Sequence, residues 1–154
     1  MSYYTARPYT VSRRNKKPEE GVHLLACRYL KKYYPDVDFL SDYAAGLHMT
    51  INQAKKRKAM NSGRGWTDIT ILKPSREYHG LLIDFKKDGT SIYVTRGPRK
   101  GQLVANEQIQ LQAAFMERMN ELGYLARFSI GYDQFCQLVD WYLEKPELEQ
   151  ESLF

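Results

Sequence analysis

The segment HGLLIDFK, residues 79–86, constrains the fold more than any other part of the chain. Apolar residues run through it almost without interruption, which is typical of a strand that is buried on both faces. Such a strand needs helices above and below it, so the segment predicts a layered α/β domain. The same run carries Asp84, and Lys86 follows two residues later.

The remaining segments alternate between helical and strand-like patterns. A helix is expected to begin at Pro18, because the first turn needs no donor from that residue, and to end before Pro35. Further helices are expected over 50–61, over 107–122 with Gly123 as the stop, and over 132–145. Strands are expected over 37–43, 66–72, 80–87 and 124–131, the middle two joined as a hairpin. The predicted fold class is therefore α/β, with a small mixed central sheet flanked by helices.

Length and composition indicate one domain with two different ends. With 154 residues the chain matches the usual size of a single domain. We expect an N-terminal arm over 1–17, a folded domain over 18–145 and an acidic tail over 146–154. No apolar run reaches membrane-spanning length, and the N-terminus lacks the apolar core of a secretory signal. A cytoplasmic location and a reduced pair of core cysteines, Cys27 and Cys136, are the expectation.

Positive charge is concentrated in a few stretches. The net charge is +5, and an acid-free stretch before the strand expected over 66–72 carries Lys55, Lys56, Arg57, Lys58 and Arg64. Clustered positive charge favours a polyanionic partner, with contacts to backbone phosphates. A solvated helix face is the alternative interpretation. The glycine-rich stretch 87–106 has the same two interpretations, as a basic flap or small hairpin and as a soluble loop.

Two aspartates lie in the expected hairpin. If segments 66–72 and 80–87 pair around a turn near residue 76, Asp68 faces Asp84 directly across the two strands. Two facing acids repel each other unless positive charge lies between them. A hard cation such as Mg²⁺ converts that repulsion into coordination, because it prefers carboxylate oxygens. The pair therefore predicts a divalent-metal site.

Lys86 belongs to the same face of the strand as Asp84, because side chains in a strand alternate with a period of two. A lysine beside a metal-bound water orients that water or stabilises charge that develops on a phosphate. The three residues therefore suit the hydrolysis of a phosphodiester. A solvated ion pair at a strand end is the alternative.

The residues GWTD, IDFK and QAAFMERMNELGY, in this order, resemble the VRR-NUC domain of the PD-(D/E)xK nuclease superfamily, and above all its stand-alone phage and bacterial forms. The resemblance covers roughly residues 18–145 and implies a restriction-endonuclease-like core. Two positions depart from the family pattern. Thr67 replaces the proline of the PD motif, and Asp84 replaces the glutamate of ExK, which brings the metal closer to its strand.

Carried over residue by residue, the resemblance implies the following roles. Asp68 and Asp84 would hold Mg²⁺ or Mn²⁺, Lys86 would assist the attacking water, and Gln112 would brace the site from the following helix. A further metal-binding carboxylate would come from Glu20 by likeness to the family. Helical periodicity favours Glu19 instead, so both residues stay candidates.

The function implied is a metal-dependent deoxyribonuclease, an endonuclease acting as a homodimer on branched DNA such as a Holliday junction, in a bacterial cell or a phage-infected host. A non-catalytic DNA-binding accessory protein on the same fold is the main rival, and a nuclease that acts on RNA is a second. The histidines share no metal-like spacing and are interpreted as surface or packing residues; they are His23, His48 and His79. The arm tyrosines are candidates for stacking on bases.

Overall fold

A computed structural model of the chain describes residues 18–42, 48–63 and 65–144, with the side chains of residues 18–20 left out. The predicted arm and acidic tail lie outside these residues. Within them, four helices and four strands follow the order α1, β1, α2, β2, β3, α3, β4, α4. Their bounds are Pro18–Tyr33 (α1), Phe39–Ser41 (β1), Ile51–Ala59 (α2), Ile69–Ile71 (β2), Leu81–Lys86 (β3), Glu107–Glu121 (α3), Leu125–Ile130 (β4) and Gly131–Tyr142 (α4).

The four strands form one mixed sheet in the order β1-β2-β3-β4. The first two pairings are antiparallel, and β3 pairs with β4 in parallel through the α3 crossover. The predicted hairpin is confirmed with its predicted register, because Ile69 lies opposite Ile83 and Ile71 opposite Leu81. The predicted fold class, a mixed α/β domain with helices around a small sheet, is therefore confirmed.

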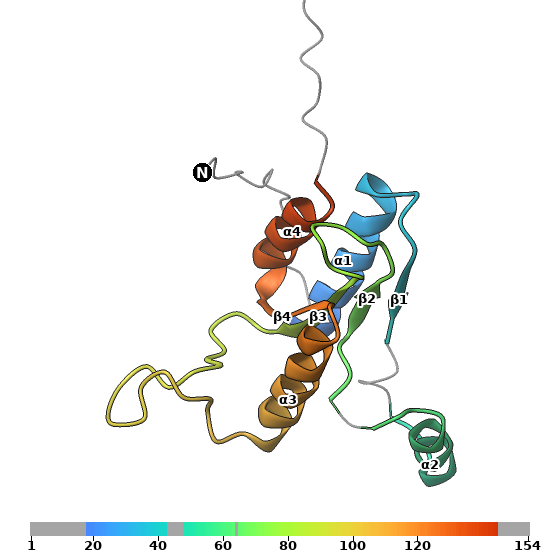
Figure 1. Ribbon diagram of the computed structural model, residues 1–154. Coiled ribbons are helices and arrows are strands. Elements are labelled where there is room, and N and C mark those ends of the chain that lie inside the picture. The colour runs from blue at the N-terminus through green and yellow to red at the C-terminus, as the bar shows by residue number, and fades with distance from the viewer. Residues whose placement is uncertain (1–17, 43–47, 64, 145–154) are drawn as a thin grey trace, which may run out of the picture.

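Helices cover both faces of the sheet, as the apolar β3 segment requires. Figure 1 shows α1 and α4 side by side over one face, with α3 on the other. All residues of β3 except Lys86 are buried. Leu81, Ile83 and Phe85 point into the larger cluster under α1 and α4, whereas Leu82 joins Phe115 and Met116 of α3. Alternation along β3 therefore turns Asp84 toward α3.

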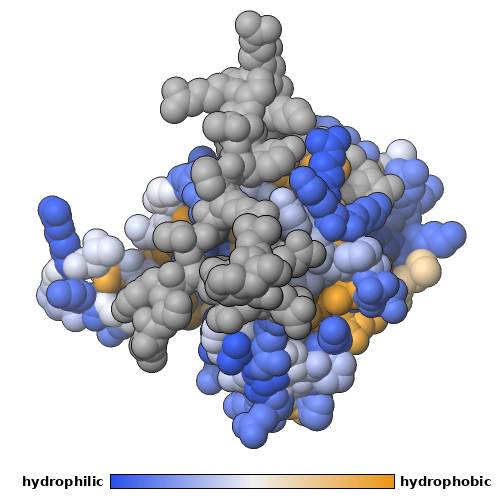
Figure 2. All heavy atoms as spheres, turned by 90° about the horizontal axis from the view of Figure 1, so that it is seen from above, coloured by the Kyte–Doolittle hydropathy of each residue, from blue (hydrophilic) through white to orange (hydrophobic). Residues whose placement is uncertain are grey.

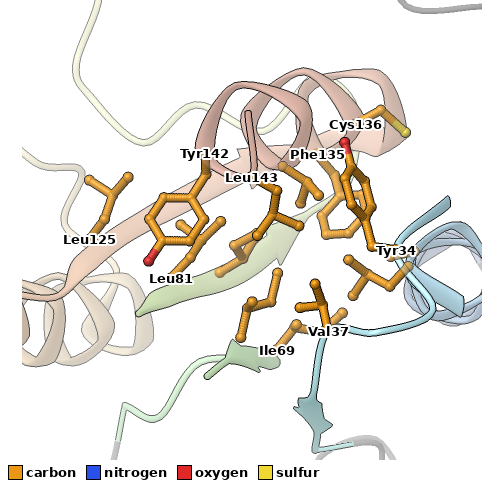
Figure 3. Close-up of a cluster of buried hydrophobic side chains, with 14 of the residues drawn as sticks. Tyr34, Val37, Ile69, Leu81, Leu125, Phe135, Cys136, Tyr142 and Leu143 are labelled. Carbon is orange, nitrogen blue, oxygen red and sulfur yellow. The ribbon is translucent and has the colours of Figure 1, made fainter. Parts of the chain in front are cut away.

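The larger cluster is the main core of the domain. Figure 3 shows Phe135 and Tyr142 of α4 packed over Leu81 and Ile69 of the sheet, with Tyr34 at the edge. The side chains of Ile69, Leu81, Phe135 and Tyr142 are completely buried. These contacts fix the strands whose ends carry the candidate site residues.

Several expected elements are shorter than predicted, among them the strand expected over 37–43, which spans Phe39–Ser41, and the helix expected over 132–145, which spans Gly131–Tyr142. The strand expected over 66–72 begins only at Ile69, because the loop before it turns toward α3. The helix expected over 50–61 ends at Ala59. At its start the Thr50 side chain accepts a hydrogen bond from the Gln53 backbone N–H, and the Gln53 side chain accepts one from the Thr50 N–H. This reciprocal pairing is a capping box.

Two segments extend from the sheet body in Figure 1, α2 and the connection 87–106. The connection contains the predicted small hairpin: Tyr93 pairs with Leu103, and the Val94 N–H donates to the Gln102 carbonyl at 2.8 Å. Helix α2 buries none of its residues. Most charged side chains of the two segments are therefore exposed to solvent, although Arg57 of α2 is only partly exposed.

The described surface is mainly polar. Among the coloured residues in Figure 2, which exclude the grey ones, most are hydrophilic, with separate hydrophobic groups between them. None of the helices in the described segments combines the length and the apolar character that crossing a membrane requires. Cys27 is partly buried and Cys136 is buried, and neither forms a disulfide bond.

Candidate active site

Asp84 is the buried centre of the candidate site. Only 1% of its surface is exposed, although it carries a carboxylate in the middle of an apolar strand. Its Oδ2 accepts a hydrogen bond from the Lys86 ammonium, and its Oδ1 accepts one from the Gln112 Nε2 at 2.8 Å. A buried carboxylate is tolerated only with such donors. Asp84 is therefore held in one orientation by charge and by hydrogen bonding.

Lys86 and Gln112 complete a closed triangle with Asp84. The Lys86 Nζ donates to the Gln112 Oε1 at 2.8 Å as well as to Asp84. The Lys86 side chain is 12% exposed, so the ammonium lies at the edge of the buried region. Gln112 occupies a buried position of α3, between Ile109 and Met116. The structure thus brings together three residues predicted for the site from two different elements.

Asp68 lies at the neighbouring strand end. Continuing the β2–β3 register by one residue sets it opposite Asp84. Its Oδ2 accepts a hydrogen bond from the Phe85 backbone N–H at 2.8 Å, which ties it to the residue after Asp84. Its Oδ1 accepts no hydrogen bond from the described residues. The two acids therefore reach the same end of the β2–β3 pair, as the hairpin geometry predicts.

Burial raises the pKa of Asp68 above the ordinary range of a carboxyl group. The Phe85 hydrogen bond and the charges of His23 and Lys86 act in the opposite direction, and the charge of Asp42 adds to the rise. The net rise means that the surrounding donors and cations do not fully compensate the Asp68 charge. A site of this kind is stabilised by further positive charge.

Gly65 explains why the motif begins with glycine. Its φ is +90°, a conformation that favours glycine, and a Cβ there would lie 2.6 Å from the Leu111 carbonyl oxygen. The loop therefore contacts the α3 backbone immediately beside Gln112. Thr67, in the place of the motif proline, is buried, and its hydroxyl finds no hydrogen-bond partner among the described residues.

His23 is a site neighbour that the sequence interpretation missed. It extends from α1 toward the strand ends, where its Nε2 lies 2.5 Å from the Ser41 Oγ and its ring packs against Phe85 at 5.5 Å. Its effect on Asp68 marks the same neighbourhood. The interpretation as a packing residue holds, but the packing is against the site. Its spacing of four from Glu19 was the available signal.

The two glutamate candidates stay predictions. Glu19 and Glu20 belong to the first turn of α1, but their side chains lie outside the described part of the chain. Among the side chains that the structure describes, no three His, Cys, Asp or Glu residues gather closely enough to hold a metal ion. The described candidate metal ligands are thus Asp68 and Asp84.

The predicted phosphate-binding residues differ in their surroundings. Lys55, Lys56 and Lys58 are exposed on α2. Arg57 instead makes an ion pair with Asp42 at 2.5 Å, and the Asp42 N–H donates to the Asp68 carbonyl at 2.9 Å. Arg57 therefore ties α2 to the site. Arg64 lies outside the described residues.

Comparison with known proteins identifies a solved structure with a similar fold. No family model matches the sequence, and no curated protein matches it. A solved structure called "VRR_NUC domain protein" is similar with a TM-score of 0.57 and 22% sequence identity. The similarity covers 85% of this chain and 92% of that one. At this identity the likeness concerns the fold, and we conclude that the chain has the fold of a VRR-NUC domain protein.

Proposed function

We propose that this protein is a divalent-metal-dependent endonuclease of the PD-(D/E)xK superfamily, of the stand-alone phage or bacterial type, that hydrolyses DNA phosphodiester bonds. One observation carries the proposal: a lysine is held by a buried aspartate and a glutamine beside a second aspartate at the adjacent strand end. The fold likeness and the order of the motifs add support.

The donor set fits a small hard cation. Two carboxylates lie on neighbouring strands, and Asp68 keeps one oxygen without a hydrogen bond from the described residues. Mg²⁺ is commonly held by one or two carboxylates, with waters and substrate phosphates in its other positions. Burial raises the pKa of Asp68, and a bound cation would offset that cost of its charge. Asp68 and Asp84 would hold Mg²⁺ or Mn²⁺, with Glu19 and Glu20 as candidates for a third carboxylate.

The bound ion would polarise the scissile phosphate and make its attacking water more acidic. In the proposed reaction the attacking water gives up a proton to the solvent as its oxygen forms a bond to phosphorus, one bridging P–O bond breaks, and the leaving oxygen takes up a proton from the solvent. Lys86 orients the attacking water and stabilises the added negative charge on the phosphate. Asp84 and Gln112 keep the Lys86 ammonium at the edge of the site. Gln112 also fixes the rotation of the Asp84 carboxylate.

Helix α2 is the proposed phosphate-binding surface. Its exposed lysines, Lys55, Lys56 and Lys58, lie on the element that Arg57 ties to the site through Asp42. Replacing these lysines with glutamine should weaken DNA binding for all sequences alike. The slope of log K against log salt should become shallower by about 0.9 for each phosphate that the variant no longer neutralises. Lys31→Gln, at an exposed position of α1, is the control.

The proposed substrate is branched DNA such as a four-way junction, and the proposed active species is a homodimer. Both rest on the resemblance of the motifs to stand-alone VRR-NUC proteins. A panel of duplex, flap, junction and RNA substrates tests the first proposal, and sedimentation of the protein tests the second. Preferential cutting of RNA would overturn the choice of DNA.

The decisive experiment follows cleavage of this panel with Mg²⁺, with Mn²⁺ and with EDTA. Wild-type protein should cut DNA only with a metal, and Lys86→Gln should lose most of that activity. The matched control is Lys87→Gln, because Lys87 is the adjacent lysine and is exposed. Binding of DNA without cutting under every metal condition would favour the accessory-protein alternative and overturn the nuclease proposal.

A further inference from the structure

Trp66 is an anchored aromatic side chain beside the candidate site. It lies two residues before Asp68, and 42% of its surface is exposed. Its ring packs against Phe115 of α3, with the ring centroids 4.8 Å apart, and its Nε1–H donates to the Ser62 Oγ at 3.2 Å. One side of the indole and its polar edge are therefore fixed, so that stacking on a ligand would cost little conformational entropy.

The surroundings of Trp66 carry positive charge. The Arg118 guanidinium lies 5.8 Å from the Phe115 ring on which Trp66 packs. Ser62, the hydrogen-bond partner of the indole, follows α2 and its exposed lysines at 55, 56 and 58. An exposed aromatic ring between cationic elements is how single-stranded nucleic acid is bound, with bases on the ring and phosphates on the cations.

The second tryptophan provides a contrast. Trp141 of α4 is also exposed, by 47%, but the Arg76 guanidinium lies over its ring at 4.4 Å. Arg76 also donates to the Trp141 carbonyl at 2.6 Å. Trp141 is thus occupied by a residue of the same chain, and neither candidate metal ligand is near it in sequence.

We propose that Trp66 stacks on an unpaired nucleobase of the DNA strand that enters the site. This inference rests on the proposed nuclease function and deepens it, because it specifies a substrate with unstacked nucleotides next to the scissile phosphate. A fully paired duplex offers no free base face to the indole. Stacking on Trp66 therefore favours DNA with unpaired nucleotides near the scissile phosphate.

The test uses Trp141→Phe, in which Trp66 is the single tryptophan. Its fluorescence is followed during titration with a duplex that contains a short unpaired stretch and with a fully paired duplex of equal length, in EDTA at low salt. Fluorescence anisotropy of labelled DNA measures binding independently. We expect strong quenching by the open DNA and little by the paired DNA. Trp66→Phe, which keeps only Trp141, should show no quenching.

Two substitutions separate stacking from packing. Trp66→Leu retains apolar contact with Phe115 but removes the aromatic face, and it should weaken binding of the open DNA by about tenfold. Trp66→Phe should retain most of the affinity. Circular dichroism and thermal melting confirm that both variants are folded. Equal affinity of the Leu variant and the wild type for the open DNA would overturn the inference.

The remaining outcomes distinguish this inference from the proposed function. Bound DNA without quenching, while wild-type protein still cuts DNA with Mg²⁺, overturns the stacking role alone. Quenching without any cutting supports the stacking role and overturns the catalytic proposal. Absence of binding to either DNA overturns the stacking role, and it overturns the nuclease proposal as well if wild-type protein cuts neither DNA with Mg²⁺. A Trp66→Leu variant that changes from dimer to monomer, with unchanged DNA affinity, would assign the ring to a protein interface and overturn the inference.

Discussion

Two buried aspartates lie on opposite sides of the sheet and are satisfied in different ways. Asp140 of α4 is 9% exposed and accepts hydrogen bonds from the hydroxyls of Tyr29, at 2.6 and 2.8 Å, and Tyr34, at 2.5 Å. Asp84 is 1% exposed and is held by the ammonium of Lys86 and the amide of Gln112. One carboxylate has hydroxyl donors, and the other has a cation beside a second acid.

The different donors around Asp140 and Asp84 indicate different roles for the two regions. The Asp140 cluster joins α1 to α4, and burial, together with the hydrogen bond to Asp140, raises the pKa of Tyr29, so its hydroxyl stays protonated and keeps donating. The Asp84 region places two acids and a lysine at a strand edge, where like charges oppose each other. The Asp140 cluster therefore suits a role in stability, whereas the proposed function gives Asp84 a role in chemistry at some expense of stability.

The largest expected effect separates the two aspartates by activity. Asp84→Asn should reduce metal-dependent DNA cleavage by about 10²–10³-fold, because the site loses a proposed metal ligand and the carboxylate that holds Lys86. Initial rates on the junction substrate measure the loss. An Asp140→Asn variant, assayed at a temperature where it is folded, should cleave at the wild-type rate. Equal losses in both variants would remove the distinction.

The same charge pair offers a stability test. Replacing Asp84 alone leaves the Lys86 ammonium without its carboxylate and should destabilise the fold. Replacing both residues, Asp84→Leu with Lys86→Met, should recover only part of the lost stability, because the unpaired ammonium is removed but the buried Gln112 amide lacks both partners. Urea unfolding measures both. Partial recovery is the expected result, and a double variant less stable than the single one would contradict it.

The next effect concerns stability on the other side of the sheet. Asp140→Ala leaves the Tyr29 and Tyr34 hydroxyls without this acceptor and should lower the free energy of unfolding by about 2–4 kcal/mol. Asp133→Ala is the matched control, because Asp133 is exposed on the same helix. Its effect should stay below about 1 kcal/mol. Similar effects of the two substitutions would show that the tyrosine cluster contributes little.

A smaller effect is expected at Gly65. Gly65→Ala adds a Cβ 2.6 Å from the Leu111 carbonyl oxygen at a φ of +90°, so the loop must move away from α3. We expect a loss of about 1–3 kcal/mol in unfolding free energy and a lower cleavage rate, because Gln112 adjoins that carbonyl. Gly63→Ala, where a Cβ meets nothing within 4 Å, is the control. An unchanged melting temperature in Gly65→Ala would refute this reasoning.

The smallest effect is a pH dependence of stability from Asp68. Its pKa is raised by burial in the folded state, so the folded protein binds more protons than the unfolded chain does. Protonated Asp68 therefore contributes to stability at low pH, and this contribution is fully present below about pH 4, the ordinary aspartate pKa. It decreases as pH rises and is lost once the pH exceeds the raised pKa of the folded state. Asp68→Asn keeps an oxygen acceptor for the Phe85 N–H but does not titrate. Unfolding in EDTA between mildly acidic and neutral pH should show a smaller decline in the variant, and identical profiles would contradict the assignment.

Most of the fold followed from local patterns. The uninterrupted apolar run of β3 predicted helices on both faces, and Pro18, Pro35 and Gly123 marked helix ends. The hairpin register was also accessible, because a turn near residue 76 sets which residues face each other. The length of β2 could not be predicted, because the strand-like pattern of the sequence continues back through Thr67 and Trp66. In the structure, Gly65 instead turns the loop before β2 onto α3.

The sequence predicted which residues belong to the candidate site but not how those residues contact one another. The sequence indicated Asp68, Asp84 and Lys86 through strand geometry, and Gln112 through a family resemblance. The position of Gln112 between Ile109 and Met116, on the buried side of α3, was a further sign that Gln112 has a polar partner. A polar residue among buried apolar residues needs such a partner. Two contacts join elements that are distant in sequence: His23 lies against Ser41, and Arg57 pairs with Asp42. No local sequence pattern encodes such contacts.

The sequence by itself determined the layers, the strand that carries the acid and lysine, and the facing of two aspartates, because periodicity and turn position are local properties. Only the tertiary structure decided that Gln112 closes a triangle with Asp84 and Lys86. It also decided that Arg57 pairs with Asp42, and that the exposed Trp66 packs against Phe115. These outcomes depend on how α2 and α3 approach the sheet, which is set by packing between segments far apart in the chain.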